Sequence, residues 1–304
     1  MSENLRDLSE NLAAVVARAA PSVVRVESRR RGGASGVAWS PDAIVTAHHA
    51  VEWDEPIWVG LPDGSMVTVT LAGRDPATDL ALLSLAGGGL APPEWSEAPD
   101  LSVGHLVLGL CRPGRSVRAS FGIVSALADS WRAPAGGRLD RYLQTGLPLQ
   151  RGFSGSLLVD ATGRALGVNT SGLLRGASLA VPTATVRRVV ESLRRRGSVR
   201  RGYLGIGTYP VPLPSRLEGE LGQASGLLVL SVASESPAEA AGLLFADTLV
   251  SLGGHPVGSA SDLVALLDEE SVGRRETARI VRAGGVLEIP VTVGGRGAGS
   301  PPSP

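Results

Sequence analysis

The sequence contains little cysteine, few aromatic residues and no lysine. One cysteine, Cys111, occurs among 304 residues, aromatic residues make up 4% of the chain, and all 29 basic residues are arginine. A single cysteine excludes an intrachain disulfide, so nothing here indicates an oxidising compartment. Because Cys111 lies in the apolar run HLVLGLCRPG, we expect a small core residue there rather than a reactive thiol.

An excess of charge of one sign and long apolar runs are also missing. The 29 basic and 29 acidic residues balance, which excludes the electrostatic footprint of a nucleic-acid-binding protein. No window reaches the roughly 18 apolar residues of a membrane-spanning helix. The first 21 residues carry three acids and no continuous apolar stretch, unlike a secretory signal. We therefore expect a cytoplasmic protein, with a periplasmic location left open if the N-terminus is truncated.

What the chain does contain indicates several domains rich in β-structure. With 304 residues, 43% of them hydrophobic, it can form two or three domains with buried cores. Its 40 glycines and 21 prolines predict many turns, which favours a mainly β or mixed architecture over a helical bundle. At the start, leucines and valines from Leu5 to Val16 recur at helical spacing, so residues 1–20 are expected to form an amphipathic helix.

Residues 21–197 alternate short β-like runs with turn signals such as SPD and PDG. That density of short strands predicts a β-sandwich or a pair of barrels. A helix should close the segment, with Thr183 or Thr185 as its N-cap and Gly197 at its end.

The pattern changes after a short linker at residues 198–201. Residues 202–293 read as a smaller module of mixed strands with two helices, in SPAEAAGL and SASDLVALLDEE. The glycine- and proline-rich tail, residues 294–304, is expected to be disordered.

The run RGFSGSLLVD places Ser154 between glycines just ahead of an apolar strand. An ordinary turn serine is the plain alternative, because a serine hydroxyl is a weak nucleophile without a base that is itself oriented. The chain offers His49 after one strand and Asp79 before another, with gaps of 30 and 75 residues in the order His, Asp, Ser. His48 is a rival for the base. No metal-ligand cluster or nucleotide motif is present, so we expect no metal and no other cofactor.

Five blocks in this order resemble the HtrA (DegP/DegS-type) serine proteases: SGVAWSPDAIVTAHHAV, GRDPATDLALLSL, FGIVSAL, LQTGLPLQRGFSGSLLVDATGRALGVNT and SLAVPTATVRRVVESL. The resemblance implies a chymotrypsin-like double β-barrel over 21–197. By it, His49 is the general base, Asp79 orients the base, and Ser154 is the nucleophile. It also implies an oxyanion hole at Gly152, Phe153 and Ser154, in which the first and last supply backbone N–H groups.

The resemblance also implies binding sites for peptides. Leu149, Thr170 and Ser171 would line an apolar S1 pocket for small or medium aliphatic residues such as Val or Ala. The second module resembles a PDZ domain, an α+β fold. Its GYLGIG run would bind a peptide C-terminus beside the helix at residues 261–270, through the loop Tyr203, Leu204, Gly205 and Ile206.

Taken together, the resemblance implies an ATP-independent endopeptidase, assembled as a homotrimer, that cleaves unfolded or damaged proteins. Two departures, Ser156 at a usual glycine and Pro148 in the preceding loop, leave open a catalytically silent PDZ-based peptide-binding or chaperone scaffold. An esterase with the same triad is less favoured, because its G-x-S-x-G turn lies between a strand and a helix, whereas Ser154 precedes a strand.

Overall fold

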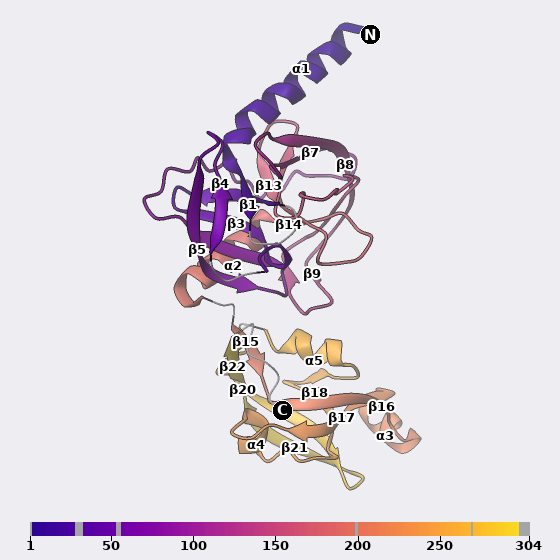
Figure 1. Cartoon of the computed structure of the whole chain (residues 1–304). Helices are drawn as coiled ribbons and strands as arrows, with labels where there is room; N and C mark the ends of the chain where they lie inside the picture. Colours follow the sequence, from indigo (N-terminus) through magenta and orange to yellow (C-terminus); the bar gives the residue numbers. More distant parts are fainter. Residues whose placement is uncertain (1, 28–32, 53–55, 198–199, 269, 298–304) are drawn as a thin grey trace. The chain divides into compact units, whose positions relative to one another are not determined.

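The structure, a computed structural model, describes residues 2–27, 33–52, 56–197, 200–268 and 270–297. The chain divides into two compact units, Met1–Ser198 and Val199–Pro304 (Figure 1). The first two residues of the expected linker, 198 and 199, lie outside the described residues. No helix in the described part of the chain is long and apolar enough to cross a membrane.

The first unit begins with a closed barrel of six antiparallel strands in the order β1-β2-β3-β6-β5-β4. Its aliphatic side chains fill the interior in one continuous cluster. The strands are β1 (Val23–Glu27), β2 (Ala34–Ser40), β3 (Ala43–Ala47), β4 (Ile57–Gly60), β5 (Met66–Asp75) and β6 (Leu80–Ser84).

A second closed barrel follows, in the order β11-β14-β13-β12-β7-β8. Its strands are β7 (Leu106–Cys111), β8 (Arg118–Ala128), β11 (Tyr142–Thr145), β12 (Leu157–Asp160), β13 (Ala165–Thr170) and β14 (Leu179–Pro182). A separate pair, β9 (Trp131–Arg132) and β10 (Arg138–Leu139), lies in the connection between β8 and β11. The prediction of a mainly β protein built on two barrels is confirmed.

The two barrels meet along strands that are buried on both faces. Every residue of β3 and of β13 is buried, because each strand fills its own barrel on one side and packs against the other strand on the opposite side. Polar residues at the ends of these two strands are therefore brought together although they lie far apart in sequence.

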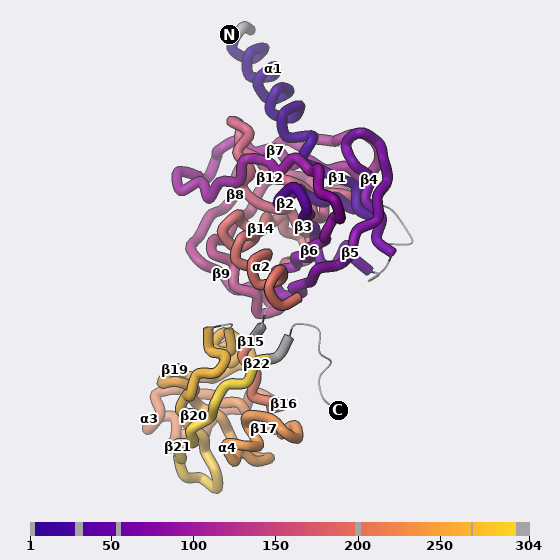
Figure 2. Tube along the Cα trace, turned by 90° about the vertical axis from the view of Figure 1, so that its left-hand side faces the viewer, coloured from indigo at the N-terminus to yellow at the C-terminus, as the bar shows by residue number. Residues whose placement is uncertain are grey.

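Two long helices flank the barrels. α1 (Ser2–Ala19) extends away from them in both views (Figures 1 and 2). Its second half packs Val15 and Ala19 against the second barrel, while Leu5 and Leu8 near its start remain 66% and 38% exposed. The apolar stripe predicted for this helix is thus buried only along its second half.

α2 (Thr183–Arg196) closes the first unit and packs on β5, β6 and β13. It ends at Gly197, which has φ +70° and donates its N–H to the carbonyl of Leu193, as predicted. The predicted N-cap is wrong: the hydroxyl of Thr183 donates to the carbonyl of Ala165, and that of Thr185 donates to Asp140. Both side chains anchor the helix to the barrel instead of capping it.

The second unit is built on an antiparallel sheet in the order β16-β17-β18-β20-β21, with a short strand β19 beside β18. The strands are β16 (Ile206–Pro212), β17 (Ser225–Val232), β18 (Thr248–Leu252), β19 (His255–Pro256), β20 (Arg275–Arg282) and β21 (Gly285–Thr292). The two predicted helices are α4 (Pro237–Ala241) and α5 (Ala260–Leu266). A third, α3 (Ser215–Leu221), was not predicted, because Gly219 and the preceding prolines disguise its short helical pattern.

The two ends of this unit pair with each other. β15 (Arg200–Tyr203) forms an antiparallel two-stranded sheet with β22 (Gly294–Gly297). Residues expected in a linker and in a disordered tail thus form backbone hydrogen bonds with each other. No local side-chain pattern predicts this pairing. The remainder of the predicted tail, residues 298–304, lies outside the described residues.

Candidate active site

The first barrel supplies an imidazole and a carboxylate at the seam. His49 lies in a single 3₁₀ turn, η2 (His48–Ala50), directly after β3, and Asp79 directly precedes β6. The Asp79 carboxylate, 4% exposed, lies with Oδ2 2.7 Å from His49 Nδ1 and accepts the His49 backbone N–H at Oδ1 over 2.9 Å. The Asp79 carbonyl accepts the backbone N–H of His48 over 2.9 Å. Three hydrogen bonds therefore join the 3₁₀ turn to Asp79, and one of them is made by the imidazole.

The second barrel supplies a hydroxyl to the same place. Ser154 lies in the loop between β11 and β12, and its Oγ is 3.0 Å from His49 Nε2. The structure thus brings together the three residues singled out in the sequence. No described hydrogen bond joins the ring of the rival His48 to Ser154. Burial and the charge of Arg74 lower the pKa of His48, so it is a neutral neighbour of this group.

The end of β13 completes the surroundings of the carboxylate. The hydroxyl of Thr170 donates to Asp79 Oδ2 in a short hydrogen bond. The prediction that Thr170 lines the S1 pocket is wrong. The residue is 1% exposed, and its hydroxyl is bound to the carboxylate of Asp79. A methyl group at Gly172 would lie 2.5 Å from Asp79 Oδ2 and 2.7 Å from His49 Nδ1. The sequence analysis missed this role of Gly172. The only local feature that marks the position is the run NTSG at residues 169–172.

The loop before Ser154 presents two backbone N–H groups. Gly152 has φ +97°, and a Cβ there would lie 2.6 Å from the Cβ of Pro113, so a glycine is required. Within the described ranges, no acceptor pairs with the N–H of Gly152 or of Ser154. The N–H of Phe153 instead donates to the carbonyl of Gln150 over 3.0 Å. Phe153, predicted as part of the oxyanion hole, therefore contributes no free donor.

A serine of the first barrel holds this loop in place and was missed from the sequence. The buried Ser35 donates its hydroxyl to the carbonyl of Gly152 over 2.7 Å and accepts the N–H of Arg112 over 2.8 Å. Its own N–H donates to the carbonyl of Ser154 over 3.2 Å. The first barrel thus binds the carbonyl of Gly152 through the hydroxyl of Ser35.

A cleft of about 340 Å³ lies beside the hydroxyl. No carboxylate lines it within the described ranges, and the predicted pocket residues Leu149 and Ser171 do line it, whereas Thr170 does not. The lining consists of Gly33, Ala34, His49, Leu149, Gln150, Arg151, Gly152, Ser154 and Ser171.

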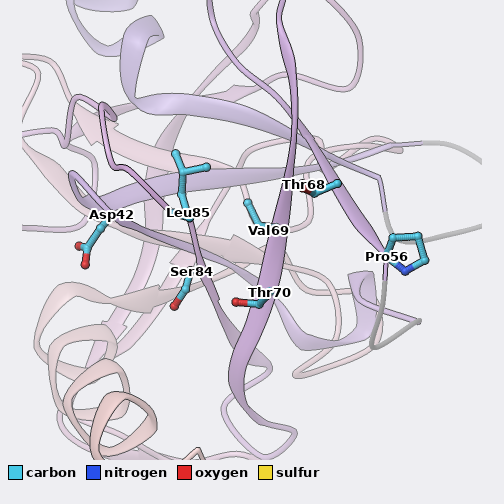
Figure 3. A pocket seen from close by; sticks show the side chains of 8 residues that line it. Asp42, Pro56, Thr68, Val69, Thr70, Ser84 and Leu85 are labelled. Atoms are coloured by element: carbon cyan, nitrogen blue, oxygen red, sulfur yellow. The ribbon is translucent and has the colours of Figure 1, made fainter.

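A larger hollow, of about 560 Å³, lies elsewhere on the first barrel, where β5 separates from the end of β6. Its labelled side chains spread over these strands and the flanking loops (Figure 3). Among the described lining residues one carboxylate occurs, that of Asp42, and hydrogen bonds from Ser40 and Arg194 lower its pKa. No hydrogen bond between a nucleophile and a base occurs among its described lining residues.

Comparison with known proteins supports the resemblance seen in the sequence. A sequence profile of the trypsin-like peptidase domain matches residues 34–168, and one of the PDZ domain matches residues 202–293. The chain is 32% identical over 277 residues to a probable periplasmic serine endoprotease, DegP-like, of Chlamydia pneumoniae. It is 28% identical over 302 residues to the serine endoprotease DegS of Haemophilus influenzae. The chain belongs to the HtrA family of serine proteases.

Coverage differs between these HtrA relatives. The alignments span 88% and 90% of this chain, but 56% of the Chlamydia protein and 85% of DegS. Among solved structures, the HtrA-type protease AlgW with a decapeptide superposes with a TM-score of 0.73 at 26% identity. A serine endoprotease from Yersinia pestis gives 0.73 at 28% identity, and both comparisons cover 94% of this chain and 98% of the other.

Ser156 and Pro148, the departures from the HtrA pattern noted in the sequence, do not disturb the contacts described above. Ser156, where the family has glycine, is fully buried and accepts a hydrogen bond from Asn169 Nδ2 over 3.0 Å. Pro148 is exposed in the loop after β11. The buried hydroxyl of Ser156 thus has a polar partner in Asn169.

The PDZ module presents the loop expected to bind a peptide. Gly205 has φ +83°, and its carbonyl accepts the N–H of Ala233. Leu204 is 1% exposed and its carbonyl accepts the N–H of Ala238, so this residue anchors the loop in the core. β16 begins at Ile206 and forms one edge of the sheet, on the side where α5 packs. An edge strand offers unpaired backbone groups to an added strand.

Proposed function

We propose that the chain is a serine endopeptidase with Ser154 as nucleophile, His49 as general base and Asp79 as orienter of the base. The observation that carries this proposal is the continuous chain of contacts from Asp79 Oδ2 to His49 Nδ1, 2.7 Å, and from His49 Nε2 to Ser154 Oγ, 3.0 Å. His49 accepts the Ser154 proton as the oxygen attacks the peptide carbonyl and returns it to the leaving amine. Asp79 stabilises the imidazolium formed between these steps.

The N–H groups of Gly152 and Ser154 form the oxyanion hole in this proposal. Their support is that neither has an acceptor within the described ranges, and that Gly152 and Ser154 line the same cleft. Such donors stabilise the charge that develops on the substrate oxygen, and each contributes about 10²–10³ in rate in enzymes of this kind.

The substrates are unfolded or damaged proteins, cleaved without ATP. The cleft of about 340 Å³ has no carboxylate among its described lining residues and includes Leu149, which favours small or medium aliphatic P1 residues such as Val or Ala over Lys or Arg.

The PDZ module binds C-terminal peptides at Tyr203, Leu204, Gly205 and Ile206. The peptide adds as a strand to the β16 edge, and backbone N–H groups of the loop hold its terminal carboxylate. AlgW, a relative of the same family, has been solved with a decapeptide and with a tripeptide.

We further propose a homotrimer located in the periplasm. Curated relatives carry the word periplasmic in their names, which disfavours the cytoplasmic location expected from the sequence. Analytical ultracentrifugation of the full chain tests the trimer.

Fluorophosphonate labelling of the full chain tests the enzymatic proposal. Wild type should be labelled and should cleave casein, whereas Ser154→Ala should do neither. Ser125→Ala, which removes an exposed hydroxyl on β8, is the matched control and should behave as wild type. A wild-type chain that is not labelled, even with a C-terminal peptide present, would instead favour the silent PDZ scaffold.

A further inference from the structure

The contacts around Ser154 determine which group donates each proton. An ionised carboxylate can only accept, so His49 Nδ1 carries the proton shared with Asp79 Oδ2. In a neutral imidazole the other nitrogen, Nε2, then holds a lone pair. The hydroxyl of Ser154 is therefore the donor across the 3.0 Å to Nε2. Its single proton is used in this bond.

A second hydroxyl reaches the same oxygen. Ser171 Oγ lies 3.2 Å from Ser154 Oγ. Because the only proton of Ser154 already points to His49, Ser171 must donate in this contact. We propose that Ser171 is a positioning residue for the nucleophile: its hydroxyl donates to Ser154 Oγ and holds that oxygen in the rotamer from which its proton reaches His49.

The placement of Ser171 follows from the strand that precedes it. Thr170, the last residue of the fully buried strand β13, contacts Asp79, and Gly172 passes against His49. Residues 170–172 thus contact all three members of the group: Thr170 contacts Asp79, Ser171 contacts Ser154, and Gly172 lies against both Asp79 and His49. Strand pairing fixes the backbone of β13 up to Thr170, so Ser171 directly follows a rigid element, whereas Ser154 lies within the loop between β11 and β12.

This role differs from the S1 contact expected from the sequence. Ser171 lines the cleft, but its hydroxyl is directed to Ser154 and not to a P1 side chain. Removing the hydroxyl should therefore slow the attack of Ser154 without changing which P1 residue is preferred. The inference rests on the proposed function, because it requires Ser154 to be the nucleophile.

The test compares Ser171→Ala, Ser171→Thr and the control Ser125→Ala in the full chain. Ser171→Ala should lower the second-order rate of fluorophosphonate labelling and the kcat for peptide anilides about fivefold, the effect of one neutral hydrogen bond. The KM and the ratio of rates for Val and Ala at P1 should not change. Ser171→Thr retains a hydroxyl and should recover most of the lost rate, while tryptophan fluorescence reports whether each variant is folded.

Two results would overturn this inference and leave the proposed function standing. One is a wild-type rate in Ser171→Ala. The other is a changed ratio of rates for Val and Ala at P1 with an unchanged kcat, which would restore the S1 role of Ser171. If wild type itself is not labelled, or Ser154→Ala is still labelled, the proposed function fails and this inference fails with it.

Discussion

Two buried aspartates, one in each unit of the chain, are stabilised in different ways. Asp79 is 4% exposed and Asp247 is 1% exposed. Asp79 is held by the ring of His49, by a hydroxyl and by a backbone N–H. Asp247 accepts two hydrogen bonds from the guanidinium of Arg282, over 2.7 and 2.8 Å, and the backbone N–H of Leu244 over 2.7 Å.

The difference shows what each carboxylate is available to do. Paired with a permanent cation, Asp247 has its charge balanced in the resting protein and links a loop to strand β20. Among the described residues no arginine pairs with Asp79, and the chain has no lysine. In the proposed mechanism, its charge stabilises the imidazolium of His49 that forms during proton transfer.

Replacing Asp79 should lower activity, and replacing Asp247 should lower stability. The effect of Asp79→Asn should be the larger of the two. An asparagine can donate to His49 Nδ1 and so favours the tautomer with a proton on Nε2, which cannot accept from Ser154. We expect turnover of a peptide substrate to fall about 10⁴-fold, with the thermal unfolding midpoint little changed. Near-normal turnover in this variant would remove Asp79 from the mechanism.

Asp247→Asn should affect folding of the PDZ module and spare peptide hydrolysis. Removing the charge of Asp247 weakens its two hydrogen bonds from Arg282 and should destabilise the module by about 2 kcal/mol, as expected for hydrogen bonds to a charged group. Hydrogen exchange of peptides from β18 and β20 measures the loss. All five tryptophans lie in residues 1–198, so tryptophan fluorescence provides an internal control on the protease unit.

The same pair predicts an acid dependence. Burial opposes it, but hydrogen bonds from Arg282 and the Leu244 N–H hold the pKa of Asp247 below its usual value. A lowered pKa in the folded state means that the stabilisation is complete above the unfolded pKa of about 3.9 and is lost as pH falls through the folded value. Protection factors in β18 and β20, which correct for the intrinsic exchange rate at each pH, should therefore fall below about pH 4 in wild type and less steeply in Asp247→Asn. Equal slopes would contradict the assignment.

Much of the site could be read from the sequence, because the reacting side chains are rare and stand at strand ends. The chain has four histidines, and the spacing of His49, Asp79 and Ser154 within recognisable blocks left few alternatives. The density of short strands left a β-sandwich or a pair of barrels, and the resemblance to the HtrA proteases implied the two barrels.

What escaped prediction depends on contacts between segments distant in sequence. Thr170 and Ser35 carry ordinary hydroxyls, and only the meeting of the two barrels gives them Asp79 and Gly152 as partners. Gly172 is required because a side chain there would occupy the space of the imidazole. The pairing of β15 with β22 likewise joins residues nearly 100 positions apart. A local sequence pattern cannot predict contacts between residues that lie so far apart in the chain.

Gly172→Ala tests the tight packing around the carboxylate of the protease unit. The added methyl group must displace His49 or Asp79, and misplacing a catalytic group by about 1 Å can cost about 10²-fold in rate. We expect a loss of that size in kcat. Gly114→Ala is the matched control, because a Cβ at Gly114 meets nothing within 4 Å. A fully active Gly172→Ala would show that the backbone at this position can yield.

Thr170→Val sharpens the comparison by removing a neutral donor from Asp79 at nearly constant volume. A hydrogen bond to a charged group is worth about 1.5 kcal/mol or more, so kcat should fall about tenfold, and Thr170→Ser should restore it. If the Thr170 hydroxyl acts through the charge of Asp79, the two sites are coupled. The double variant should then have nearly the same kcat as Asp79→Asn alone. The four kcat values of this double-mutant cycle measure that coupling. An independent tenfold loss in both backgrounds would mean that Thr170 supports the fold of the β13 end rather than the carboxylate.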